Sequence, residues 1–144
     1  LADLTARRVG IGTLEQYESI AADKSGPLLG LPLALAVLAA DGSDAGQTLA
    51  LDAAMAMIRL GVAYQLLDDL RDWRLDQREN GRHLLNAVLI ASEGQPTNES
   101  IMAVRHRARA VLREAERRAA DLPSALQAPV LGLADQLADR LDAA

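Results

Sequence analysis

The sequence predicts an all-α protein, and its composition and its helix-boundary signals both lead to this. Alanine, leucine and arginine, which favour helices, are abundant, whereas β-branched residues are sparse and aromatic residues make up only 2% of the chain. The 144 residues are 50% hydrophobic, which is enough for one compact domain with a buried core. We therefore expect residues 1–144 to form a single all-helical module.

The first helices are predicted from caps and breakers. Residues 1–9 read as the end of a helix, and Thr13 followed by Gln16 predicts a capping box that opens the next one. We expect this helix to kink at Gly26-Pro27, because a proline cannot donate to the carbonyl four residues earlier and clashes with it. An apolar segment then continues to residue 40.

The remaining helices are bounded by polar and glycine- or proline-containing segments. Residues 41–44 read as a loop, and Asp44 with Gln47 predicts the cap of a long helix that ends before Asn80-Gly81. Three more helices are expected beyond it, at 83–91, 99–120 and 124–141, with a loop over 92–98.

The most informative segment is Asp68-Asp69-Leu70-Arg71-Asp72, which places three carboxylates within five residues of an otherwise apolar helix. Positions 65, 68 and 72 fall on one helix face. Like charges in this arrangement repel, so the pattern favours a divalent cation between them, and Mg²⁺ prefers carboxylate oxygens. The alternative is a solvated acidic helix end that nearby arginines balance.

A second informative feature is Lys24, the only lysine in a chain whose other basic side chains, its two histidines apart, are all arginine. A single retained lysine indicates a site for a compact ammonium group, as phosphate oxygens often require. The predicted kink would leave free backbone carbonyls beside this lysine and the Ser25 hydroxyl. The alternative is an ordinary break between two helices.

Together these segments resemble the trans-isoprenyl diphosphate synthases, the head-to-tail polyprenyl synthetases. Tyr17 followed by Lys24-Ser25-Gly26-Pro27-Leu28 is similar to the family's Y…K-T-x-x-L segment, with serine in place of threonine. The stretch from Gly61 to Asp72, which contains Tyr64-Gln65, is similar to the second aspartate-rich motif, G-x-x-[FY]-Q-x-x-D-D-x-x-D. The resemblance implies an isoprenoid-synthase-like helical bundle, of which this chain is the C-terminal half only.

The resemblance also implies an activity, a cofactor and site residues. The activity is transfer of the prenyl group of an allylic diphosphate onto isopentenyl diphosphate, which gives a polyprenyl diphosphate. The cofactor is Mg²⁺. The implied metal ligands are Asp68, with Asp69 and Asp72 in support; the implied diphosphate-binding residues are Lys24, Gln65 and Arg82; and the implied catalytic residues are Lys24, Ser25 and Gln65.

The chain departs from the family pattern upstream. The first aspartate-rich motif is missing, since Asp3 and Asp23 are isolated, and Gly81-Arg82 replaces the usual Gly-Lys. We expect a missing N-terminal half or a partner chain to supply that motif, and the 144-residue piece alone to be inactive. A homodimer is expected from the family.

Two alternative functions remain open from the sequence. One is a non-catalytic or regulatory subunit of a heteromeric synthase. The other is a different class I isoprenoid enzyme, such as a terpene cyclase or a head-to-head condensing enzyme. The Tyr64-Gln65 approach and the Lys24-Ser25 segment speak against the second alternative, because those enzymes usually organise their second metal motif differently.

Composition excludes several other classes of function. The absence of cysteine excludes disulfides and thiolate metal sites, and fits a cytoplasmic enzyme. A net charge of −5 disfavours nucleic acid as a partner, and we expect the arginines over 105–118 to form a solvated helix face. We expect no membrane span, because the apolar run over 26–40 is too short.

Overall fold

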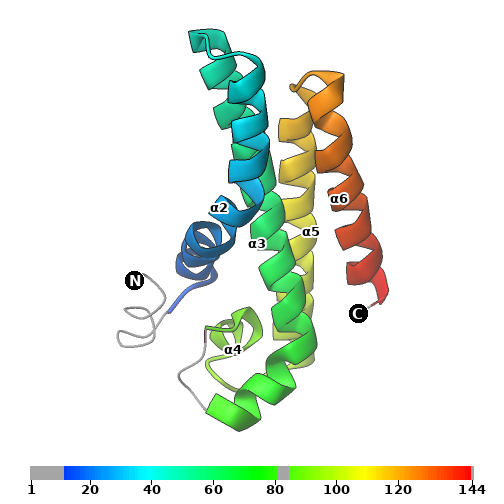
Figure 1. The fold of residues 1–144 in the computed structure, drawn as a ribbon. Helices are drawn as coiled ribbons and strands as arrows, with labels where there is room; N and C mark the ends of the chain where they lie inside the picture. The colour runs from blue at the N-terminus through cyan, green and yellow to red at the C-terminus, as the bar shows by residue number, and fades with distance from the viewer. Residues whose placement is uncertain (1–11, 81–84, 144) are drawn as a thin grey trace.

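The computed structural model describes residues 12–80 and 85–143, and helices account for 87% of these residues. No strand occurs within the two described ranges, which confirms the all-α prediction. The helices are α2 (Leu14–Ala40), α3 (Asp44–Asn80), α4 (Ala87–Ala91), α5 (Asn98–Ala120) and α6 (Ser124–Ala143) (Figure 1).

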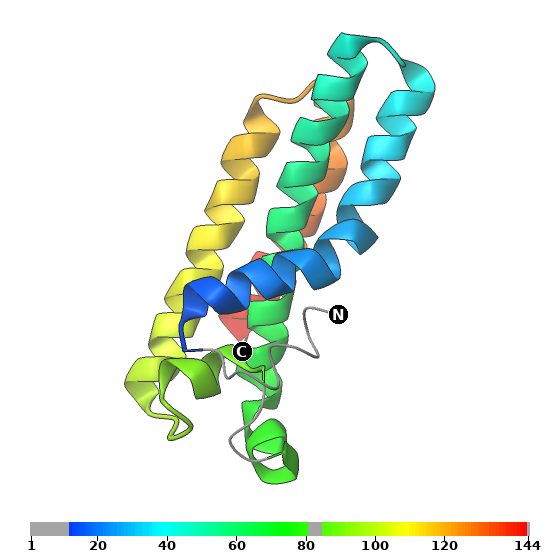
Figure 2. The same ribbon diagram turned by 90° about the vertical axis from the view of Figure 1, so that its left-hand side faces the viewer.

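The longest helix, α3, is the centre of the bundle. It contacts α2, α4, α5 and α6, and Figures 1 and 2 show α5, α6 and the second half of α2 running alongside it. Its apolar residues meet those of α5 and α6 in one buried core, which includes Leu60, Val62, Leu66, Val104, Val111, Val130 and Leu137. Because α3 also carries the aspartate-rich motif, the core fixes the helix on which the predicted site lies.

Helix α2 is continuous but bent. It contains both Pro27 and Pro32, and it changes direction between its first half and its second half (Figures 1 and 2). The bend agrees with the predicted kink, whereas the alternative of two separate helices is wrong. At its start, the Thr13 side chain accepts a hydrogen bond from the N–H of Gln16 at 3.2 Å. The Gln16 side chain accepts from the N–H of Gly12 at 3.0 Å, so the capping box is only half formed.

The predicted cap of α3 is wrong by one residue. The Ser43 hydroxyl accepts from the N–H of Gly46 at 3.2 Å, and Asp44 is already helical. The cause is the preceding turn, in which the Asp41 carboxylate accepts from the N–H of Ser43 at 2.9 Å. This local bond makes Ser43 the N-cap of α3, whose first helical residue is Asp44.

The last three helices lie close to their predicted positions. Helices α5 and α6 begin and end within two residues of the expected bounds. Helix α4 begins only at Ala87, because the Asn86 side chain caps it by accepting from the N–H groups of Val88 and Leu89. Residues 83 and 84, where this helix was expected to begin, lie outside the described residues.

Two of the helices are long and apolar. By length and composition, Leu14–Ala40 and Asp44–Glu79 could each cross a membrane. The expectation of no membrane span, which was drawn from the apolar run over 26–40, stays a prediction. A core helix of a soluble protein passes the same test, so this property is weak evidence for a membrane location.

Candidate functional site

The two sequence motifs meet where α2 crosses α3 (Figure 2). A Cβ atom at Gly61 would lie only 3.2 Å from the Cβ of Ser25 and 3.4 Å from its carbonyl carbon. The crossing is thus so close that a side chain at position 61 would require Ser25 to shift by a few tenths of an ångström. It buries Ser25, while Lys24 stays exposed on the same helix. The glycine of one motif therefore lies against the serine of the other.

Tyr17 makes a second connection between the motifs. Its side chain is only 1% exposed and lies beside the Asp69 carboxylate. Burial, and then the nearby negative charge of Asp69, raise the pKa of Tyr17. The phenol therefore keeps its proton next to this carboxylate.

Asp69 also holds the start of α4. Its Oδ2 atom accepts a hydrogen bond from the N–H of Ala87 at 2.6 Å. Burial raises the pKa of this carboxyl to about 7, although Ala87 and Tyr17 act in the opposite direction. Asp69 thus ties α3 to α4, at the place where Tyr17 of α2 lies beside it.

Asn86 extends this connection and was missed from the sequence. The side chain is fully buried, and its Nδ2 donates to Asp76 Oδ2 at 2.8 Å and to the carbonyl of Asp69 at 3.3 Å. The available signal was an asparagine directly before the apolar run at 87–91, a pattern typical of a helix N-cap.

The other two aspartates of the motif are free of such contacts. Asp68 is half-buried and Asp72 is exposed, and the described part of the chain gives neither carboxylate a hydrogen bond or an ion pair. No group of three acidic or histidine side chains converges as a metal site within residues 12–80 and 85–143. Mg²⁺ usually needs only one or two protein carboxylates beside substrate phosphates. Asp68 and Asp72, one helical turn apart, fit that requirement.

The remaining predicted site residues lie near this surface, with one exception. Gln65 is half-buried and lies one turn beyond Gly61, on the face that continues to Asp68 and Asp72. Lys24 is exposed beside the buried Ser25. Arg82 lies outside the described residues. A row of polar groups on α3 therefore begins where the Lys24–Ser25 segment of α2 crosses it.

The arginines of α5 do not all form the expected solvated face. Arg105 and Arg107 are half-buried, and Arg107 pairs with the buried Glu18 of α2. This hydrogen bond to Glu18 raises the pKa of Arg107. The expectation failed because it placed the arginines from the helical spacing of α5 alone, whereas α2 brings a carboxylate to them.

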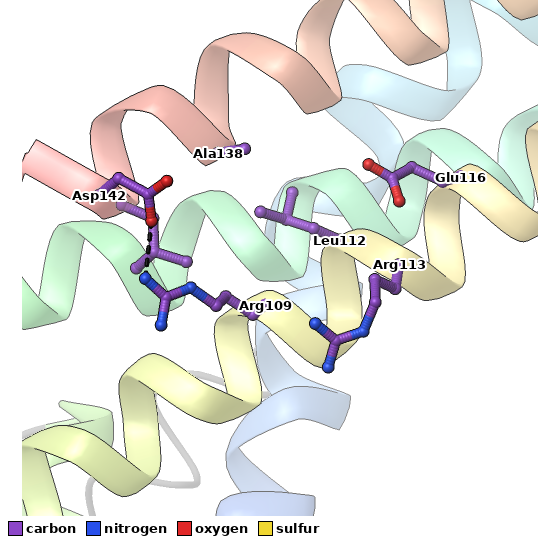
Figure 3. Close-up of a pocket in the computed structure, with 7 residues that line it drawn as sticks. Arg109, Leu112, Arg113, Glu116, Ala138 and Asp142 are labelled. Carbon is purple, nitrogen blue, oxygen red and sulfur yellow. Dashed lines mark hydrogen bonds and ion pairs between the residues drawn. The ribbon is translucent and has the colours of Figure 1, made fainter.

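A shallow depression of about 150 Å³ lies between α5 and α6 (Figure 3). It is lined by Arg109, Leu112, Arg113, Glu116, Ala138, Leu141 and Asp142, and Arg109 donates to Asp142 at 2.6 Å. These two helices carry none of the predicted site residues. The depression is therefore separate from the candidate site.

Comparison with known proteins gives one match. A family model described as polyprenyl synthetase matches residues 1–128, a range that contains both motifs and most of the helices described above. No curated protein and no solved structure matches the chain.

Proposed function

The chain belongs to the polyprenyl synthetase family of prenyltransferases, and we propose that it provides the diphosphate- and metal-binding half of a catalytic site. The proposed reaction condenses an allylic diphosphate with isopentenyl diphosphate. The observation that carries the proposal is the crossing of α2 and α3, where Tyr17 lies beside Asp69 and Gly61 admits Ser25. Lys24 belongs to the segment of α2 that makes this crossing, which supports its proposed role.

In this proposal, Asp68 and Asp72 hold Mg²⁺, and Asp69 supports them through its bond to α4 and its position beside Tyr17 of α2. Within residues 12–80 and 85–143 the carboxylates of Asp68 and Asp72 make no hydrogen bond or ion pair, and their spacing puts them on one face of α3, which supports the assignment. When bound, Mg²⁺ would neutralise charge on the diphosphate leaving group. Asp69 is better suited to support than to ligation, because one of its oxygens already accepts from Ala87.

The remaining roles follow from position and charge. Lys24 is exposed and can donate to diphosphate oxygens, and Gln65 can donate from the adjacent turns of α3. Arg82 is proposed as a further diphosphate contact, from the sequence resemblance alone. Ser25, Gln65 and the carbonyls near the bend of α2 would face the positive charge that develops as the allylic C–O bond breaks.

The second substrate reacts once that charge has formed. The double bond of isopentenyl diphosphate attacks the allylic cation, and loss of a proton, with the released pyrophosphate as the acceptor, restores a double bond. The contribution of this chain is to position the leaving group and to stabilise its charge.

We propose that the first aspartate-rich motif comes from a missing N-terminal half or from a partner chain. The exposed leucines of α2 are compatible with such a partner. A homodimeric assembly and a cytoplasmic location stay predictions from the family resemblance.

The direct experiment is an assay for Mg²⁺-dependent prenyl transfer. Geranyl diphosphate and isopentenyl diphosphate would be incubated with the 144-residue chain and with the longest reading frame that contains it, and the products identified by mass spectrometry. We expect elongated diphosphates from the longer frame only, and none after Mg²⁺ is chelated.

Two other outcomes would contradict parts of this proposal. Cyclised products without elongation would indicate a cyclase. Elongation by a separate full-length synthase that this chain merely stimulates, with Asp68→Ala as effective as the wild type, would indicate a regulatory subunit.

A further inference from the structure

Four charged side chains form a second polar cluster, away from the aspartate-rich motif. We call Glu18, Arg59, Arg107 and Glu114 the four-residue ion network. Arg107 binds both oxygens of Glu18, with Nη2 at 2.8 Å from Oε2, and its Nη1 lies 3.5 Å from Glu114 Oε1. Arg59 pairs with Glu114, and its Nη2 lies 3.7 Å from Glu18 Oε2. The network therefore joins α2, α3 and α5.

Stability alone is a weak reason for such a network. Glu18 is only 8% exposed, and removing a carboxylate from water costs about as much as a well-made ion pair returns. Apolar side chains of similar size often stabilise a core equally well. What the network adds is a defined orientation of α2, because the planar guanidinium of Arg107 donates to both oxygens of Glu18 in one geometry.

Glu18 lies next to Tyr17 in the sequence, so an orientation fixed at Glu18 also fixes Tyr17. The buried side chain of Tyr17 lies beside Asp69. The two neighbours therefore reach α3 at Asp69 and at Arg59, ten positions apart, which corresponds to about 15 Å along a helix. A helix held at one point can turn about it, whereas a helix held at two separated points cannot.

We propose that the four-residue ion network is a positioning device that holds Tyr17 against Asp69 and so sets how α2 faces the aspartate-rich helix. Glu18 is the positioning residue, since it is the only member on α2. The proposal rests on the proposed function only in its last step, in which the orientation of α2 presents Lys24 to a diphosphate.

The first test reads the position of Tyr17 directly. The chain has only two tyrosines, Tyr17 and Tyr64, so ¹³Cζ-tyrosine labelling gives two NMR signals that Tyr17→Phe assigns. We expect Glu18→Gln to move the Tyr17 signal in the direction that Asp69→Asn moves it, at a fixed pH and well below the unfolding temperature. An unmoved Tyr17 signal in folded Glu18→Gln would overturn the proposal.

Asp142→Asn is the matched control. It removes the carboxylate of the Arg109–Asp142 pair, which joins α5 to α6 and does not involve α2. We expect both tyrosine signals to stay in place. If Asp142→Asn moves the Tyr17 signal as far as Glu18→Gln does, the effect is a general loss of an ion pair and the proposal fails.

A second variant keeps the test decisive if Glu18→Gln does not fold. Arg107→Lys retains the charge but loses the two-point contact with Glu18, so the Tyr17 signal should still move. Folded Arg107→Lys with a wild-type Tyr17 signal would also overturn the proposal.

The last step is tested by binding of inorganic pyrophosphate with Mg²⁺, measured by calorimetry. We expect Glu18→Gln to weaken binding about tenfold, a size typical of couplings within one polar network, and to have no further effect in Tyr17→Phe. An equal loss in both backgrounds would show that Glu18 does not act through Tyr17. If the wild type binds no pyrophosphate, the proposed function fails, while the NMR result still decides the positioning role.

Discussion

The two halves of α2 bury opposite kinds of side chain. The first half buries Tyr17, Glu18 and Ser25. Tyr17 lies beside Asp69 of α3, and Glu18 pairs with Arg107 of α5. The second half carries no charged residue over 25–40, yet its Leu28 is 75% exposed and its Leu35 54% exposed. Hydrophobicity therefore does not decide which half of this helix is anchored.

The difference follows from how each half meets α3. In the first half, polar groups fix α2 at defined points. In the second half, small residues allow close packing: a Cβ at Gly30 would lie 3.1 Å from the carbonyl oxygen of Ala54. Leu29 and Leu33 pack toward α3 and the core, whereas Leu28 and Leu35 are exposed. We infer that the polar contacts of the first half fix its geometry. Substitutions that remove these contacts should affect the site far more than substitutions in the second half.

The largest expected effect comes from the helix that the first half faces. Asp68→Ala should lower Mg²⁺-dependent prenyl transfer in the complete enzyme about 1000-fold, because it removes a ligand of the Mg²⁺ that would neutralise charge on the leaving group. Product formation would be measured by mass spectrometry, with Asp142→Asn as the control. Turnover at the wild-type level would remove Asp68 from the metal site.

The crossing point itself can be broken at Gly61. Gly61→Val should destabilise the fold by about 3 kcal/mol, because the new side chain meets Ser25 and Leu29 within van der Waals distance. Denaturant unfolding followed by circular dichroism would measure this. Gly132→Val is the matched control, since a Cβ there meets nothing within 4 Å. Equal losses in the two variants would show that only helix propensity is at work.

Removing one hydroxyl tests the anchor at Tyr17. Tyr17→Phe should cost about 2 kcal/mol, because it removes the buried hydroxyl that lies beside the half-buried Asp69 carboxyl. Tyr64→Phe should change little, since Tyr64 is 41% exposed. Thermal unfolding of both variants at one pH gives the comparison, and the account predicts a clear difference between them.

The exposed lysine should affect binding without affecting folding. Lys24→Ala should weaken pyrophosphate binding in the presence of Mg²⁺ about tenfold, through loss of a charge-assisted hydrogen bond, and leave the unfolding temperature unchanged. Lys24→Arg keeps the charge and should recover part of the affinity. An unchanged affinity in Lys24→Ala would make this lysine an ordinary surface residue.

The smallest effect is expected in the second half of α2. Leu35→Gln should change the free energy of unfolding by less than about 0.5 kcal/mol, because more than half of this side chain is already in contact with water. Leu60→Gln, on a fully buried leucine of α3, should be severely destabilising by comparison. A large loss in Leu35→Gln would mean that the second half is anchored after all.

The helices could be predicted from the sequence because their signals are local. Caps, prolines and glycines act within a turn or two, so the bounds of α5 and α6 lie within two residues of the expected ones. The errors are also local: Asp41 shifts the cap of α3 to Ser43, and Asn86 delays the start of α4.

The candidate site was only partly predictable, because its contacts join residues far apart in the sequence. Spacing places Gln65, Asp68 and Asp72 on one face of α3, but it does not reveal that Asp69 binds Ala87 and lies beside Tyr17. The ion pairs of Glu18 were missed for the same reason, since Arg107 lies 89 positions away in the chain.

The most direct measurement is calorimetric binding of geranyl diphosphate to the 144-residue chain, with and without Mg²⁺, for the wild type, Asp68→Asn and Asp142→Asn. The account predicts binding that requires Mg²⁺, is lost in Asp68→Asn and is retained in Asp142→Asn. Binding that is equally strong without Mg²⁺, or that survives in Asp68→Asn, would contradict the claim that the crossing of α2 and α3 forms a metal-dependent diphosphate site.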